Sequence, residues 1–191
     1  MKKAVAFLTV LALLIALAAS FAAAEEAAAP ASHILVVYFS ATGTTRGVAE
    51  KLAEGLSADL YEIVPEVPYT DADLNYNNSK SRSSVETDDP SCRPAIAGEL
   101  PDLTAYDTVL IGYPIWWGDA PRIVFTFVEN VDLTDRTVAV FFTSGSSGLG
   151  NSMKHLEQQS GAGTWLEGKR FTARTSVEEL TAWAKSLGIE R

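Results

Sequence analysis

The sequence predicts an α/β domain in which a doubly wound, five-stranded parallel sheet carries helices on both faces. Residues 33–39 are nearly all apolar, and 106–113 and 136–143 have apolar centres, a pattern typical of strands buried on both faces. Stretches with helical spacing of apolar residues alternate with them, and the sequence shows no internal repeat. This alternation favours parallel strands joined by helical crossovers.

The N-terminal residues differ from this domain in composition. Lys2 and Lys3 precede an apolar run over 4–19, and small residues follow the run. This order predicts a secretory signal peptide over residues 1–24. An uncleaved N-terminal anchor is the alternative, because about 20 apolar residues can span a bilayer. Either outcome places the protein outside the cytoplasmic membrane, secreted or tethered to its outer face.

Residues 25–32 are expected to form an Ala-rich tether, and residues 33–191 a single domain. A chain of 191 residues that is 47% hydrophobic can bury a sizeable core. The formal net charge is −9, and removal of residues 1–24 changes it to −11 because two lysines and no acid are lost. This acidity disfavours nucleic acid as a partner, and membrane contact is expected only through the N-terminal segment. Cys92 is the only cysteine, so no internal disulfide or cysteine metal cluster is expected.

The first strand, 33–39, leads into a hydroxyl-rich loop at 40–45 and then into a helix predicted over 45–56. The first N–H groups of a helix lack intrahelical partners, so this arrangement can bind an anion. The loop lacks the glycine pattern of dinucleotide sites and the Gly-Lys ending of nucleotide triphosphate loops. We therefore expect a monophosphate, with simple capping of the helix as the alternative. Arg46 adds a cation near this loop.

Alternating residues at 58–64 predict an edge strand, and a long irregular segment follows it. Residues 65–101 contain five prolines and a polar run, which predicts little regular structure. Segments of this kind are usually functional or disordered. We interpret the segment as a crossover that has been replaced or elaborated and that drapes over a ligand. Tyr69 and Tyr76 are candidates to touch that ligand or to pack on the surface.

The next strand, 106–113, ends in an exit loop at 114–118, and Pro121 opens the following helix at a position that tolerates a missing N–H. A strand over 136–143 then precedes a loop of small residues at 144–150.

Three elements complete the predicted domain. A helix is expected over 151–159 and the last strand, weakly signalled, over 165–171. The final helix covers 176–187, where Ser176 and Glu179 match the capping box that begins many helices.

Three strand-exit loops, 40–45, 113–118 and 143–150, are expected along one edge of the sheet, because the carboxyl ends of parallel strands meet there. The first loop can hold the phosphate. Trp116 and Trp117 in the second are costly to expose, so one indole can stack on a flat heterocycle while the other packs beneath the loop. Burial of both in the core is the alternative. The third loop has few side chains, so its backbone can approach a ring edge and offer donors and acceptors.

From His33 onward the chain resembles the flavodoxin-like proteins. The resemblance is to the branch that carries Ser-x-Thr-Gly-x-Thr and Gly-Tyr-Pro-Ile-Trp-Trp-Gly segments, here at 40–45 and 112–118. It implies the flavodoxin-like strand order 2-1-3-4-5 and bound FMN. The three loops, with a phosphate site, an indole and backbone groups for a ring edge, point to the same cofactor. The cofactor-binding residues are then expected to be Ser40, Thr42, Gly43, Thr44, Thr45, Pro114, Ile115, Trp116, Trp117, Gly118, Thr143, Ser144, Gly145, Ser147 and Gly148.

The leading functional hypothesis is an exported, FMN-binding electron-transfer protein. A flavin would supply the electron chemistry while protein groups orient it. Its partner would be a redox protein or a small-molecule electron donor or acceptor. A flavin-dependent NAD(P)H or quinone oxidoreductase and a non-catalytic flavin carrier are the alternatives. No catalytic residue and no metal site is assigned. His155 is expected to face solvent, with a position near the flavin as the alternative.

Overall fold

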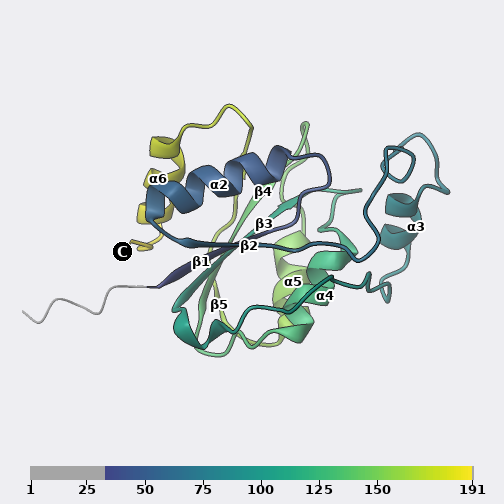
Figure 1. Cartoon of the computed structure of the whole chain (residues 1–191). Helices are drawn as coiled ribbons and strands as arrows, with labels where there is room; N and C mark the ends of the chain where they lie inside the picture. Colours follow the sequence, from purple (N-terminus) through teal and green to yellow (C-terminus); the bar gives the residue numbers. More distant parts are fainter. Residues whose placement is uncertain (1–32, 191) are drawn as a thin grey trace, which may run out of the picture. The chain divides into compact units, whose positions relative to one another are not determined.

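The computed structural model of the protein describes residues 33–190 (Figure 1). The predicted signal peptide at 1–24 and the tether at 25–32 lie outside the described residues. Within the described part of the chain, no helix combines the length and the apolar character needed to cross a membrane.

The sheet is parallel throughout, in the predicted order β2-β1-β3-β4-β5. Its strands are β1 (Ile34–Tyr38), β2 (Asp59–Glu62), β3 (Thr108–Pro114), β4 (Thr137–Thr143), β5 (Thr164–Trp165) and β6 (Lys169–Phe171). At the centre, Val36 of β1 lies beside Leu60 of β2 and Leu110 of β3. β1, β3 and β4 are almost wholly buried, as their apolar sequences predict, whereas β2 lies at the edge and is partly exposed.

The fifth strand position differs from the single strand predicted over 165–171. β5 pairs with the first half of β4 and β6 with the second half, and residues 166–168 interrupt them. Gly168 accounts for part of the interruption, because a Cβ at this position would lie 2.4 Å from Cγ2 of Val140. The chain therefore passes too close to β4 there for a side chain.

Helices cover both faces of the sheet, which confirms the doubly wound architecture (Figure 1). They are α2 (Thr44–Leu56), α3 (Arg82–Asp88), α4 (Arg122–Asn130), α5 (Ser152–Ser160) and α6 (Val177–Ser186), with a 3-10 turn at Leu103–Ala105. α2 and α6 bury their apolar residues against one face of the sheet. α4 and α5 bury theirs against the other. The capping box of α6 is present in part, because Glu179 N–H donates to Oγ of Ser176 over 3.2 Å.

The segment 65–101 contains a helix that the sequence did not predict. α3 has no apolar stripe, and polar contacts hold it: Arg82 donates to Glu86 within the helix and to the carbonyl of Val67 before it. Before α3, the chain forms short turns in which the N–H groups of Thr70 and Asn77 donate to the side chains of Asp73 and Asn75. The expectation of little regular structure holds for most of the segment, and α3 is the exception. It lacks a sequence signal because side-chain contacts replace the apolar periodicity that signals most helices.

Candidate functional site

A pocket of about 470 Å³ lies at the carboxyl ends of β1, β3 and β4, where the three predicted loops meet. Its volume falls within the range of small-molecule sites. The residues that line it are Ser40, Ala41, Thr42, Thr44, Thr45, Leu74, Tyr76, Pro114, Ile115, Trp116, Thr143, Ser144, Gly145, Phe171, Thr172 and Ala173. None of these residues is charged, so the pocket must bind a ligand through hydroxyls, amides and apolar surface.

The first loop ends at the N-terminus of α2, whose first turn no side chain caps. Gly43 occupies the N-cap position with a φ of 83°, a conformation that glycine adopts without strain. A Cβ at Gly43 would meet nothing within 4 Å, so the space beside this backbone is open. Hydroxyls of the loop and N–H groups of the first helical turn therefore suit a phosphate group.

The first and third loops are joined directly. Oγ1 of Thr45 and Oγ1 of Thr143 are 2.8 Å apart, and both side chains are buried. Although these residues were expected to bind the cofactor through separate loops, the structure brings them together as one hydrogen-bonded pair. This bond fixes the spacing between the two walls of the pocket.

Arg46, expected to add a cation near the phosphate loop, is paired with a carboxylate. Its guanidinium pairs with Glu62 at the end of β2, and this hydrogen-bonded carboxylate raises the pKa of Arg46. Because Glu62 neutralises it, Arg46 adds no unpaired charge to the phosphate loop.

The two tryptophans of the second loop take different positions, as predicted for a pair with one indole beneath the loop. Trp116 is 3% exposed and meets the ring of Phe39 edge-on at 5.4 Å and that of Tyr69 at 5.0 Å. Trp117 is 51% exposed and meets the ring of Tyr76 at 5.5 Å. Trp116 lines the pocket, whereas Trp117 and Gly118 do not.

A tight turn sets these two positions. The N–H groups of Trp116 and Asp119 donate to each other's carbonyls, both over 2.9 Å. The two residues between them, Trp117 and Gly118, have φ values of 51° and 84°. Positive φ at both central residues is the type I′ arrangement, which favours Asn-Gly. A tryptophan in this left-handed region carries strain of about 1–2 kcal/mol.

The third loop contributes less of its length than expected. Thr143, Ser144 and Gly145 line the pocket, whereas Ser147 and Gly148 do not. The hydroxyl of Ser144 donates to the carbonyl of Ser147, so the loop closes on itself after Gly145.

Two further segments reach the pocket. Leu74 and Tyr76 come from the irregular segment, so that segment does border the site. The other is residues 171–173, at the end of β6 and just after it. Lys51 of α2 holds the chain after β6 by donating to the carbonyls of Ala173 and Thr175 over 2.9 and 3.1 Å. The sequence carried a signal for this fourth segment, because the last predicted strand ended at Phe171 on the same edge of the sheet.

Tyr69, the other candidate ring contact, does not line the pocket. Its hydroxyl donates to Glu86 over 2.6 Å, and the guanidinium of Arg82 lies 3.9 Å above its ring. Burial, together with the hydrogen bond to Glu86, raises the pKa of Tyr69. Tyr69 is thus a packing residue behind Trp116.

A profile of the flavodoxin family matches residues 33–187, nearly all of the described chain. The chain belongs to the flavodoxin family. Among solved structures it is similar to a flavoprotein from Bacteroides eggerthii, with 48% identity, a TM-score of 0.79, and coverage of 83% of this chain and 99% of that one. A second flavoprotein, from Bacteroides uniformis, gives 44% identity and a TM-score of 0.77, and the match covers 81% of this chain and 99% of that one.

A more distant similarity concerns the fold alone. The Lactobacillus acidophilus flavoprotein, solved in complex with FMN, shares 23% identity with a TM-score of 0.62, and the match covers 81% of this chain and 99% of that one. No curated protein matches the chain. The expected flavodoxin-like fold is thereby confirmed for this flavodoxin-family chain.

Proposed function

We propose that the protein binds FMN in the pocket at the carboxyl edge of the sheet and transfers electrons through it. The observation that carries the proposal is the composition of this pocket. One part consists of hydroxyls beside the uncapped N-terminus of α2, and another of apolar and aromatic side chains, chiefly Leu74, Ile115 and Trp116. A flat ring system that bears one phosphate satisfies both parts.

The residues present fit FMN in charge as well as in shape. A phosphate dianion can accept hydrogen bonds from Ser40, Thr42, Thr44 and backbone N–H groups, and charge-assisted bonds of this kind are strong. The apolar wall would exclude water from a ring. The side chains of residues 143–145 are small, so the backbone groups of this loop could reach the edge of the ring. When bound, FMN would supply one- and two-electron chemistry. The fold that holds FMN in the Lactobacillus flavoprotein is the fold of this chain.

The proposed reaction takes place outside the cytoplasmic membrane, with a redox protein or a small molecule as partner. The sequence of residues 1–24, with two lysines before an apolar run, supports export. Expression in a bacterial host followed by fractionation and intact-mass measurement tests this part. A mass that lacks residues 1–24 is expected. Full-length protein in the cytosolic fraction would contradict export while leaving FMN binding unaffected.

Titration of the purified protein with FMN tests the central proposal. We expect saturation at one FMN per chain, with shifted flavin absorption and quenched flavin fluorescence, and weaker binding of riboflavin, which lacks the phosphate. An unchanged flavin spectrum at saturating concentrations would contradict the proposal. With FMN bound, rapid bleaching on mixing with NADPH or NADH would indicate an oxidoreductase instead of a carrier of electrons. Bound FMN that exchanges electrons with no acceptor would indicate a flavin carrier.

A further inference from the structure

The turn that carries the two tryptophans depends on contacts outside itself. A type I′ turn is most favourable with Asn-Gly at its centre, and here the first central residue is Trp117, with a φ of 51°. A bulky residue persists in this conformation only where the surroundings hold it. Asp119, the residue that closes the turn, makes the contacts that can do so.

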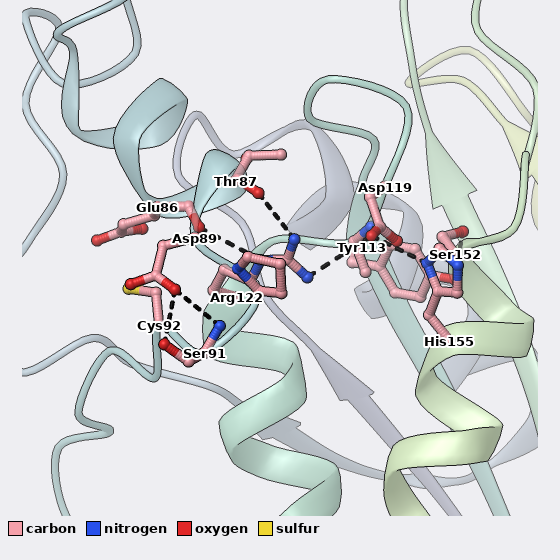
Figure 2. A network of polar contacts seen from close by, with 12 residues as sticks. Glu86, Thr87, Asp89, Ser91, Cys92, Tyr113, Asp119, Arg122, Ser152 and His155 are labelled. Carbon is pink, nitrogen blue, oxygen red and sulfur yellow. Dashed lines mark hydrogen bonds and ion pairs between the residues drawn. The ribbon is translucent and has the colours of Figure 1, made fainter.

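Three groups meet the carboxylate of Asp119 (Figure 2). Oδ1 accepts the N–H of Ala120 over 2.8 Å. Oδ2 lies 3.1 Å from Nδ1 of His155 on α5 and 3.6 Å from Nη1 of Arg122 on α4. The Asp119 side chain is 15% exposed and that of His155 is 44% exposed, so the carboxylate is largely shielded from water but the imidazole is not. His155 is exposed, as expected, and is also a partner of the tryptophan turn.

Arg122 extends this cluster to the irregular segment. Its guanidinium lies between Thr87 and Asp119 in Figure 2, and it donates to the carbonyls of Thr87 and Glu86 over 2.8 and 3.3 Å. The Arg122 side chain is 9% exposed, and its guanidinium lies 4.9 Å from the centre of the Phe125 ring. Loss of Asp119 would leave this nearly buried cation without the one carboxylate that it meets in the described structure.

The end of α3 is connected to both sides of the turn. Through Arg122, the carbonyls of Glu86 and Thr87 connect to Asp119. Through the carboxylate of Glu86, the same helix binds Tyr69, whose ring packs against Trp116. Through these contacts, residues of α3, α4 and α5 all support the same turn.

We propose that Asp119 is a positioning residue, which holds the tryptophan turn at the pocket through His155 and Arg122. The proposal rests on the proposed function in one respect, because the bound ligand whose affinity the turn affects is taken to be FMN. Asp119 does not line the pocket. It acts through Trp116 and Trp117, and its side chain need not touch the flavin.

The first experiment needs no flavin. The protein is labelled with 5-fluorotryptophan, its four resonances are assigned by single Trp→Phe substitutions, and Asp119→Ala is compared with the unmodified protein. We expect the resonances of Trp116 and Trp117 to shift or broaden, and those of Trp165 and Trp183, on other elements, to stay unchanged. Equal changes at all four would indicate general loss of structure, and no change at Trp116 and Trp117 would overturn the proposal.

The second experiment measures FMN affinity and midpoint potential for Asp119→Ala, Asp119→Asn and the control Asp132→Ala. Asp132 also accepts a backbone N–H, that of Thr134 over 2.9 Å, but it follows α4 at the opposite edge of the sheet. We expect Asp119→Ala to weaken FMN binding about tenfold or more and to change the potential. Asp119→Asn retains an acceptor for Ala120 and is expected to lie between Asp119→Ala and the unmodified protein.

The two experiments separate two failures. If Asp119→Ala binds FMN with the affinity and potential of Asp132→Ala, Asp119 has no positioning role and the proposal falls. If the unmodified protein binds no FMN, the proposed function fails instead, and the fluorine spectra still decide whether Asp119 holds the turn.

Discussion

The end of the pocket that we propose binds the phosphate (the phosphate end) comes from one continuous stretch, residues 40–45, whereas the end proposed to hold the ring (the ring end) combines Leu74 and Tyr76 of one segment with Trp116 of another. The first depends on a helix N-terminus and on Gly43. The second depends on aromatic contacts such as that between Tyr76 and Trp117. Local chain geometry builds one end, and tertiary packing builds the other.

This difference has consequences for stability as well as for binding. At the phosphate end, glycine adopts the left-handed conformation without strain. At the ring end, Trp117 adopts it with strain, and contacts from the surrounding segments must hold it there. Backbone strain at a positive φ is thus absent at Gly43 and present at Trp117. Substitutions at the two ends should therefore have different effects.

The largest effect is expected at the phosphate end. Replacing Thr42 and Thr44 together with valine keeps the shape of the loop and removes two hydroxyls that line the pocket. A hydrogen bond to a charged group contributes about 1.5–3 kcal/mol, so FMN affinity should fall by about a hundredfold or more. Riboflavin affinity should change little, because riboflavin has no phosphate. Fluorescence titration with both flavins measures the two values.

Thr134→Val is the matched control for this pair, since Thr134 is an exposed threonine at the opposite edge of the sheet. It should leave the affinities for both flavins unchanged. Equal losses of FMN and riboflavin affinity in the Thr42→Val, Thr44→Val protein would show that the loop does not bind the phosphate.

An intermediate effect is expected at the ring end, from Trp117→Asn. Asparagine tolerates the left-handed conformation and forms the favoured Asn-Gly turn, which relieves about 1–2 kcal/mol of strain. The edge-on contact with Tyr76, worth about 0.5–1.5 kcal/mol, is lost at the same time. In a Tyr76→Ala background that contact is already absent, so Trp117→Asn should there raise the free energy of unfolding by about 1 kcal/mol. Urea denaturation of the unmodified protein, the two single variants and the double variant measures this change.

Trp117→Asn should lower the affinity for FMN even where it raises the free energy of unfolding. Trp117→Asn removes an indole that packs against Tyr76, which lines the pocket, and should weaken FMN binding by about tenfold although it relieves the strain of the turn. A substitution that left affinity unchanged would mean that Trp117 has no part in holding the ring. Loss of stability in the Tyr76→Ala background would mean that the turn is not strained.

The parts of the fold that the sequence predicted are those with local signals. The buried strands, the helix after 40–45 and the capping box at Ser176 each depend on neighbouring residues. The sheet order followed from the resemblance and is confirmed by the pairing. At the site, the meeting of three loops followed from the parallel sheet, since their strands end at one edge.

What the sequence could not predict depends on contacts between distant residues. The pairing of Arg46 with Glu62, and that of His155 with Asp119, has no local signature. The interruption at 166–168 depends on the approach of Gly168 to Val140. α3 depends on polar contacts with residues before it and lacks apolar periodicity. In each case the deciding partner becomes visible only once the chain has folded.

The smallest effect is expected in α3, whose residues do not line the pocket. Ser83 is fully buried, and its Oγ is the one buried side-chain oxygen or nitrogen atom without a hydrogen bond in the described structure. Its neighbour Ser84 is also buried, but its hydroxyl bonds to Oγ of Ser81 over 2.8 Å and to the carbonyl of Asn78 over 3.1 Å. The two serines form a matched pair that differs in hydrogen bonding.

Ser83→Ala removes an unsatisfied hydroxyl and adds helix propensity, so it should raise the free energy of unfolding by about 0.5–1 kcal/mol. Ser84→Ala breaks two buried hydrogen bonds and should lower it by about 1 kcal/mol or more. Thermal and urea denaturation measure both. Neither change should alter FMN affinity by more than about twofold, because the contacts that reach the tryptophan turn come from Glu86 and Thr87 at the other end of the helix. A destabilising Ser83→Ala would show that the hydroxyl has a partner in solution.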